Sequence, residues 1–419
     1  MGRSPQAGAP PLAVDAPPLE LPWEGTALQE RLREVIDRTF HGLRRSVRTN
    51  LVLLTEALLL LVRGGRSGQG RLSLHAIARQ LRTPGRPQSR YKRLHRFLDC
   101  LRFDPASGTS GLVQLALGVR PPTRVLPVLV DQVTIGTVQV LHLGTPYRGR
   151  VLPVGFRTFA YPLTEGSQSR LELTALAELA TSLPAGVRPL WIQDRGYARV
   201  RLVEEFTRAG ELFIIRGRGN VGGCCAGGAW QRLAAVAAGI PPNVAVRFTH
   251  ALYHTTRRRP VDLVCYRDPA FQEPWALILP PDSEAQLPTV QAVQAYRERM
   301  QIEQGHRDWK THLGMRGLQL KVRQPERLAR LLMVFAIAYA LVLLLGASHL
   351  GKTLRDQIEI RRARPRHGTT RTLSVLTLGC ALLATPRHLP RAWAKLLQLL
   401  HALRDGAGIL SFRPAAQPP

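Results

Sequence analysis

The chain has 419 residues, of which 45% are hydrophobic, so it has room for two or three domains around a large core and is not a disordered protein. It carries 58 Lys and Arg against 29 Asp and Glu, a formal net charge of +29. The basic residues run from Arg3 to Arg413, so the excess is not a detachable tail. A GC-rich genome would contribute some of this arginine, but a surface so positive favours a nucleic-acid partner.

Cysteine usage and apolar runs bear on the compartment. The five cysteines are scattered and form no C-x-x-C pair, so we expect free thiols in a reducing cytosol. Residues 1–22 lack the apolar segment of a cleavable signal peptide. The apolar run at 331–347 is shorter than the ~20 residues that span a bilayer. We therefore expect a buried helix and no membrane partner, with a membrane span as the alternative.

The first part of the chain is predicted to be a leader followed by helices. Proline-rich residues 1–24 predict a disordered leader, and periodic apolar residues predict a helical domain over 25–103. Within it, residues 73–101 resemble a helix-turn-helix whose second helix buries its apolar side, including Leu101. The cations of that helix would then reach DNA: Arg90, Lys92, Arg93 and Arg96. A basic amphipathic helix in any small bundle is the alternative, and a linker is predicted over 104–122.

A different pattern begins at residue 123. Apolar runs predict strands and periodic segments predict helices, in the order strand, strand, strand, helix, strand, helix, strand. The predicted strands cover 124–131, 137–143, 150–159, 189–194 and 212–215, and the predicted helices cover 169–183 and 200–209. This is the element order of a ribonuclease-H-like α/β core, whose first part we place at 123–216.

The rest of the chain is predicted in three parts. Short alternating stretches predict a mostly β insertion over 217–288. The core resumes over 289–350 with the helix that carries Glu303. A basic, helical C-terminal region follows over 351–419.

The helix from Tyr296 has two faces when it is drawn at about 100° per residue. One polar stripe holds Tyr296, Arg299, Glu303 and Lys310. A separate apolar stripe can pack on a core, and it consists of Ala295, Ile302, Trp309 and Leu313. A carboxylate beside two cations and an aromatic ring suits a metal-binding acid next to a phosphate backbone. A solvated face with ordinary i,i+4 ion pairs is the alternative.

Two further acids follow predicted buried strands. Asp131 and Asp194 each come at the carboxyl end of such a strand, where side chains reach the rim of a sheet. Carboxylates at a rim can hold two divalent cations that promote an in-line phosphoryl transfer, and Mg²⁺ suits such a site. An Asp after a strand is also a common helix N-cap or turn residue, and for Asp194 this alternative is the stronger.

The spacing Tyr296-x2-Arg299-x3-Glu303-x6-Lys310 resembles the YREK signature of the DDE transposases of the insertion-sequence-four family. That family has a ribonuclease-H-like core interrupted by a β insertion between its second Asp and its Glu. The resemblance extends over roughly residues 70–350.

The two aspartates also resemble motifs of that family. Asp194-Arg-Gly-Tyr197 is similar to the motif of the second acid, and Val130-Asp131 is similar to that of the first. One departure is that Thr134 stands three residues after Asp131, where the family usually has it two after. The departure affects the expected local fold after Asp131 rather than the acid itself.

The resemblance implies roles for these residues. Asp131, Asp194 and Glu303 would bind two Mg²⁺ ions, with Mn²⁺ as a substitute, and catalyse cleavage. Contacts to DNA are implied for Tyr296, Arg299, Lys310, Arg216 and Trp275. Trp275 would stack on a flipped base, with Trp230 as the second choice and a core aromatic as the alternative for Trp275.

The function implied is cut-and-paste transposition: hydrolysis at the ends of a mobile element, hairpin formation and strand transfer. The partners implied are double-stranded DNA, as terminal inverted repeats and target, and a second copy of the chain in a synaptic complex. The compartment implied is the bacterial cytoplasm, at the nucleoid. Two other functions stay open at this point: a catalytically inactive DNA-binding regulator derived from a transposase, and a metal-dependent nuclease without strand transfer.

Overall fold

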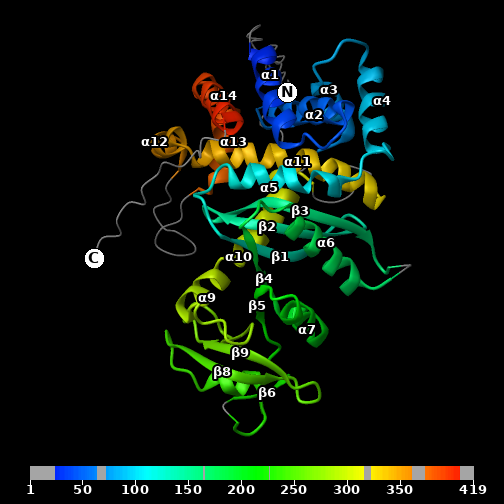
Figure 1. Cartoon of the computed structure of the whole chain (residues 1–419). Helices are drawn as coiled ribbons and strands as arrows, with labels where there is room; N and C mark the ends of the chain where they lie inside the picture. The colour runs from blue at the N-terminus through cyan, green and yellow to red at the C-terminus, as the bar shows by residue number, and fades with distance from the viewer. Residues whose placement is uncertain are drawn as a thin grey trace, which may run out of the picture.

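The structure, a computed structural model, describes residues 24–63, 72–163, 166–225, 227–315, 322–360 and 373–405. Most of the predicted leader and the last part of the predicted C-terminal region lie outside these ranges. Helices from both ends of the chain gather at one end of the molecule, and a single sheet runs from its middle to the other end (Figure 1).

The first five strands of the sheet follow the predicted order. They are β1 (Val125–Ile135), β2 (Val138–Tyr147), β3 (Arg150–Ala160), β4 (Arg188–Gln193) and β5 (Leu212–Arg216), and they lie in the order β3-β2-β1-β4-β5. β1, β2 and β3 form an antiparallel meander, whereas β4 and β5 run parallel to β1. The helices α6 (Gln168–Ser182) and α7 (Val200–Arg208) precede β4 and β5 and connect the parallel strands.

The parallel part of the sheet is buried on both faces, which explains its continuous apolar runs. Along β5, Phe213 and Ile215 pack into one core, and Leu212 and Ile214 pack into a second core on the opposite face. The second core also contains Ile302 from the helix that carries Glu303. The alternation of side chains along each strand therefore places that helix against the sheet.

The prediction that β1 ends at Asp131 was wrong. The strand continues to Ile135, because Gln132 to Ile135 keep pairing with β2. Its parallel pairing with β4 does stop near the predicted point, since the last pair is Val130 with Gln193. Asp131 and Asp194 are therefore the next residues on two adjacent parallel strands.

Residues 217–288 are mostly β, as predicted, but their strands continue the core sheet. The elements are β6 (Gly222–Cys224), β7 (Gln231–Arg232), α8 (Leu233–Ala238), β8 (Ala245–Tyr253), β9 (Arg259–Tyr266) and β10 (Trp275–Leu279). β10 pairs antiparallel with β5, and the order onward is β9-β8-β6-β7, which makes one sheet of ten strands. The segment thus lengthens the core sheet instead of forming a sheet of its own.

The N-terminal helices are α1 (Glu24–Thr39), α2 (Arg45–Arg63), α3 (Leu74–Gln80) and α4 (Pro87–Leu98). α3 and α4 form the predicted pair of helices joined by a turn, and the Ser73 side chain caps α3 by accepting from Ala76 N–H. Leu94, Phe97 and Leu98 are buried as expected. Leu101 is 91% exposed, contrary to the prediction, because α4 ends at Leu98 and the helical period does not reach it.

The predicted linker at 104–122 is instead folded onto the core. It forms a 3-10 turn, η2 (Pro105–Gly108), and helix α5 (Thr109–Leu117). Leu112, Val113 and Ala116 are buried, and α5 contacts β3 and α6. Its apolar residues therefore seal one side of the sheet.

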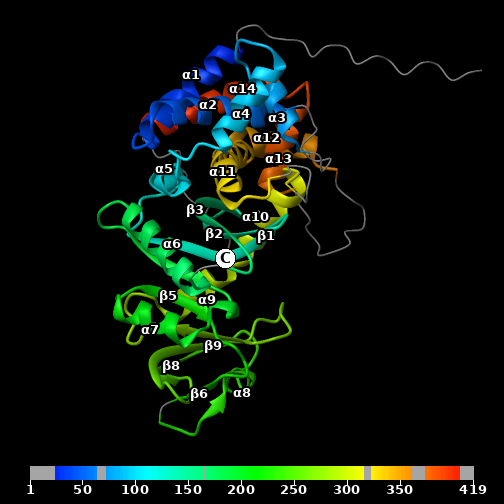
Figure 2. The same cartoon turned by 90° about the vertical axis from the view of Figure 1, so that its right-hand side faces the viewer.

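The predicted buried helix is α11 (Pro325–Ala347). Within the described ranges it is the one helix long and apolar enough to cross a membrane, and its most apolar window is wholly buried in the fold. It lies at the centre of the helical end, in contact with α2, β3 and α13 (Val375–Ala384). α12 (His349–Ile358) and α14 (Leu389–Asp405) complete this end (Figure 2).

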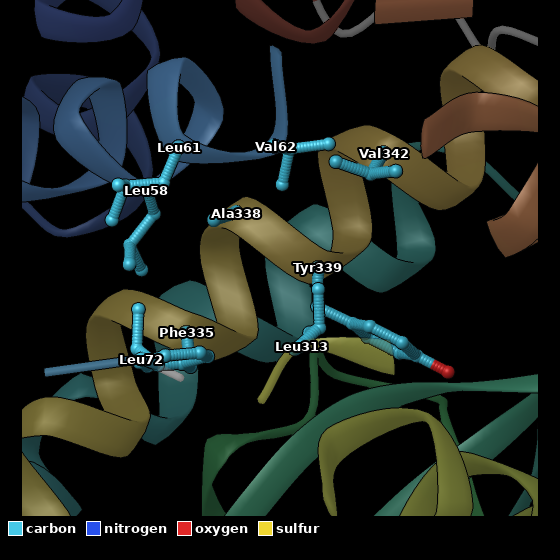
Figure 3. A pocket seen from close by; sticks show the side chains of 9 residues that line it. All are labelled: Leu58, Leu61, Val62, Leu72, Leu313, Phe335, Ala338, Tyr339 and Val342. Atoms are coloured by element: carbon cyan, nitrogen blue, oxygen red, sulfur yellow. The ribbon is translucent and has the colours of Figure 1, made fainter. Parts of the chain in front are cut away.

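A small apolar cavity lies between α2 and α11 (Figure 3). Leu58, Leu61 and Val62 line it from α2, and Phe335 and Ala338 line it from α11. The hydroxyl of Tyr339, another lining residue, donates to Asp308 Oδ2 over 3.1 Å. The cavity wall is apolar and presents no charged side chain. The acids singled out by the sequence lie elsewhere, at the rim of the sheet.

Candidate active site at the rim of the sheet

The segment predicted as one helix from Tyr296 to Lys310 is three pieces. They are α9 (Thr289–Arg297), α10 (Met300–Arg307) and a π-helical turn, η4 (Asp308–His312). The predicted apolar stripe is confirmed at Ile302, Trp309 and Leu313, which are buried. Both views show α10 beside β1, which it contacts (Figures 1 and 2). The packing of this stripe fixes the side of α10 that faces the two aspartates.

Arg299 stands at the junction of α9 and α10 and approaches all three predicted acids. Its Nη1 lies 3.9 Å from Asp131 Oδ2 and 3.9 Å from Asp194 Oδ2, and its Nη2 lies 2.5 Å from Glu303 Oε1. The Arg299 side chain is only 8% exposed. Carboxylates from β1, from the end of β4 and from α10 therefore surround one buried guanidinium.

Tyr296 was predicted on the polar stripe, but its ring is buried. The ring packs edge-on against Trp275, with the centroids 4.9 Å apart, and only its hydroxyl reaches the acids. That hydroxyl donates to Asp194 Oδ1 over 3.4 Å. Burial raises the pKa of Tyr296, with Arg299 lowering it in opposition, so the phenol stays protonated and acts as a donor.

The pKa of Asp131 reflects its burial and, to a smaller extent, the neighbouring acids. Burial raises the pKa of Asp131 to about 6. The backbone N–H of Gln132 and the charge of Arg299 oppose this rise, and the charges of Glu303 and Asp194 add to it. Burial therefore disfavours the ionised form of Asp131 most, the two other acids add to the effect, and a bound cation would favour ionisation.

The donor set suits a hard divalent cation, because carboxylate oxygens are the ligands that Mg²⁺ takes. Asp131, Asp194 and Glu303 are the residues that could hold it. Within the described ranges, however, no three His, Cys, Asp or Glu side chains are already grouped closely enough to hold a metal. Arg299 lies between the three acids and supplies the positive charge that they share.

Lys310 lies on the π-helical turn, beyond Trp309. A π-helical turn has more residues per turn than an α-helix, so the polar stripe drawn for a regular helix does not extend to Lys310. The charge of Lys310 helps to lower the pKa of His306 on α10, after burial, which is the larger cause. Lys310 therefore lies close to His306.

The other predicted DNA contacts of the core lie around the Tyr296 ring. Arg216 Nη2 is 2.9 Å from Glu273 Oε2, and Arg195 Nη1 is 3.1 Å from the same oxygen. Trp275 is 3% exposed and packs between Phe271 and Tyr296, so its face is covered.

Two further groups of predicted contacts lie away from the acids. Trp230 is partly buried, with Arg258 6.0 Å from its ring centre. On α4, Arg90 donates to the Thr83 carbonyl and Arg93 donates to Asn50 Oδ1, which holds both against the protein. The remaining cations of α4 are exposed: Lys92 and Arg96.

Two histidines beside Asp131 were not predicted. His142 of β2 is the cross-strand partner of Asp131, and His306 of α10 has its Nδ1 3.9 Å from Asp131 Oδ2. His306 is visible in the sequence three residues after Glu303, but nothing there tells which way it points. His142 becomes noticeable only once the pairing of β1 with β2 is known.

Residues 160–341 match the family model for the transposase DDE domain. The match covers less than half of the chain; it includes Asp194 and Glu303 and begins after Asp131. A search of curated proteins found no match. The family match supports a DDE transposase, an enzyme class that acts on DNA and generally uses divalent metal ions.

Proposed function

We propose that this chain is a cut-and-paste transposase of the insertion-sequence-four family, built on a ribonuclease-H-like core. The observation that carries the proposal is the convergence of Asp131, Asp194 and Glu303 on the single guanidinium of Arg299. Three acids from distant segments meet where the parallel strands end, inside a fold whose strand order is β3-β2-β1-β4-β5. The match to the transposase DDE domain supports the same function.

In this proposal the three acids hold a pair of Mg²⁺ or Mn²⁺ ions. When bound, such ions activate a water or a 3′-hydroxyl and stabilise the leaving oxygen of the phosphodiester. The acids are suited to this task because burial, with a smaller contribution from Glu303 and Asp194, raises the pKa of Asp131, and nearby positive charge would favour its ionised form.

The YREK residues would hold the DNA backbone next to the acids. Arg299 presents a planar guanidinium that can bind a phosphate with two parallel hydrogen bonds. To do so it would turn from the acids to the DNA, which would leave the three carboxylates free to hold the metal. The Tyr296 hydroxyl, which donates to Asp194, and Lys310, on the π-helical turn, would each contact a phosphate.

Hairpin formation would use Trp275 as the platform for a flipped base. The ring is buried under Phe271, so the segment between β9 and β10 must move aside when DNA binds. Arg216 and Arg195, both paired with Glu273 on that segment, would exchange this carboxylate for DNA phosphates. Trp230 stays the second choice.

The helical domain at 25–103 would bind the terminal inverted repeats. The exposed Lys92 and Arg96 are its best placed contacts, and Arg90 and Arg93 would have to leave their partners within the protein. Synapsis of two ends implies a homodimer while the enzyme works. The compartment that fits is the bacterial cytoplasm, at the nucleoid.

Excision and strand transfer of its own element test this function. The full chain is incubated with Mg²⁺ and a plasmid that carries a marker between the genomic DNA segments flanking its gene. We expect excision at the element ends, hairpin ends on the released DNA, and joining to a second plasmid. Cleavage without joining would indicate a nuclease instead. Binding of the ends without cleavage would indicate a DNA-binding regulator.

A further inference from the structure

Two buried imidazoles lie behind Asp131. His142 is fully buried, with its ring 4.3 Å from that of Trp309 and 5.3 Å from that of His306. His306 is 8% exposed. Both rings are therefore held by packing, one on the strand next to Asp131 and one on the helix above it.

The two oxygens of Asp131 are fixed unequally. Oδ1 accepts from the backbone N–H of Gln132 over 2.8 Å. Oδ2 faces Arg299 Nη1 and His306 Nδ1, each 3.9 Å away. Arg299 is shared with Asp194 and Glu303, so it cannot hold Asp131 alone. If Arg299 turned to a phosphate, the Nδ1 of His306 would still lie near Oδ2 and could donate to it.

His306 is suited to donate because packing against His142 holds its ring in place. An imidazole in its neutral form carries one N–H, and the position of that N–H sets which atom the ring can hold. In that form the ring orients a carboxylate without competing with a cation for it. Such hydrogen bonds are often long before the site is loaded and then shorten.

We propose that His306 is a positioning residue for Asp131, donating Nδ1–H to Oδ2 and so turning the carboxylate toward Asp194 and Glu303. This inference rests on the proposed function, because it assigns His306 to the support of a metal-binding acid. Outer partners of this kind typically change metal affinity by 10- to 100-fold when they are removed. The competing explanation is that His306 only fills space between His142 and Trp309.

Two variants separate these explanations. In His306→Asn the side-chain amide stands near the place of Nδ1, whereas in His306→Gln it stands near the place of Nε2. We measure Mn²⁺ binding to the DNA-free full chain by calorimetry, together with the thermal unfolding temperature. The expected result is at least a tenfold loss of affinity for His306→Gln and a change within about threefold for His306→Asn. Equal affinities in both variants, or a loss in His306→Asn alone, would overturn the proposal.

The wild-type chain gives a second test that does not depend on variants that fold. The ¹⁵N chemical shifts of its histidine rings report which nitrogen carries the proton. The proposal requires the Nδ1–H tautomer for His306, and the Nε2–H tautomer would overturn it. If the wild-type chain binds no Mn²⁺, the proposed function fails at the metal, while the tautomer still decides the contact of His306 with Asp131.

Discussion

The hydroxyl of Tyr296 donates a hydrogen bond to Asp194 Oδ1 over 3.4 Å, although 102 residues separate them in the chain. The contact joins the end of α9 to the end of β4. It orients one oxygen of Asp194 while Arg299 approaches the other. A residue that the signature alone would place on DNA is thus also part of the support of an acid.

Tyr296→Phe tests this support. The ring packing on Trp275 is kept, so the free energy of unfolding should fall only by the lost hydrogen bond, about 1.5 kcal/mol. A hydrogen bond to a charged group contributes ~1.5–3 kcal/mol, and this long one belongs at the low end, so cleavage should slow about tenfold. Tyr253→Phe is the matched control, because its hydroxyl donates to the Ala198 carbonyl and not to an acid. Equal cleavage rates for the two variants would show that the Tyr296 hydroxyl does not support Asp194.

Arg299 is expected to compete with the metal. Arg299→Gln removes the positive charge that the three acids share, so Mn²⁺ should bind about tenfold more tightly to the DNA-free chain. Cleavage should fall at the same time, because the phosphate contact is lost. Arg216→Gln is the control: it should weaken cleavage and leave Mn²⁺ affinity unchanged. A loss of Mn²⁺ affinity in Arg299→Gln would contradict the competition.

Asp131 should make stability depend on pH. Its pKa is about 6 in the folded chain and ~3.9 in an unfolded one, so the folded state binds the extra proton between these values. The contribution of Asp131 to stability is therefore largest below about pH 4 and is lost as pH rises to about 6. In chelator, Asp131→Asn should stabilise the chain at pH 7.5 by roughly 1–3 kcal/mol and lose this advantage near pH 4.

Thermal unfolding across pH measures this difference. Asp282→Asn serves as the control, since the Asp282 side chain is 73% exposed. If the difference in unfolding temperature between Asp131→Asn and the wild-type chain stays constant from pH 4 to pH 7.5, the pKa of Asp131 is not raised in the folded chain.

Trp275 needs a conservative substitution, because the ring is part of the core. Trp275→Ala would cost about 3–5 kcal/mol of stability and confuse folding with function. Trp275→Phe keeps most of the packing with Phe271 and Tyr296, and we expect normal first-strand nicking with fewer hairpin ends. Denaturing gels of cleaved ends measure both products. An unchanged hairpin yield would reject the stacking role and leave Trp275 as a core aromatic.

Much of the fold could be predicted from the sequence, because apolar runs and helical periods report burial directly. The other boundaries of the strands and crossover helices from Val125 to Arg216 were predicted to within one residue, but the ends of β1 and β2 were each predicted four residues too early. Both strands continue because they pair with a partner strand, β1 with β2 and β2 with β3, and this pairing does not depend on local propensity. The predicted burial of Leu101 was wrong because the helical period was extended past Leu98, where α4 ends.

The site was partly predictable. The contact of Arg299 with Glu303 could be predicted from their spacing, because residues four apart meet on a helix. The burial of Tyr296 against Trp275 and the approach of His306 to Asp131 depend on how α9 and α10 sit on the sheet. Such orientations are set by tertiary packing, which no spacing in the chain records.

The most direct test of the central claim is DNA cleavage by three charge-neutralised variants. Asp131→Asn, Asp194→Asn and Glu303→Gln keep the size of each side chain and remove one carboxylate each. With Mg²⁺ and DNA that carries the element ends, the account predicts at least a hundredfold loss of cleavage in each variant, with end binding and circular dichroism unchanged. Cleavage at the wild-type rate by any one of the three would contradict it.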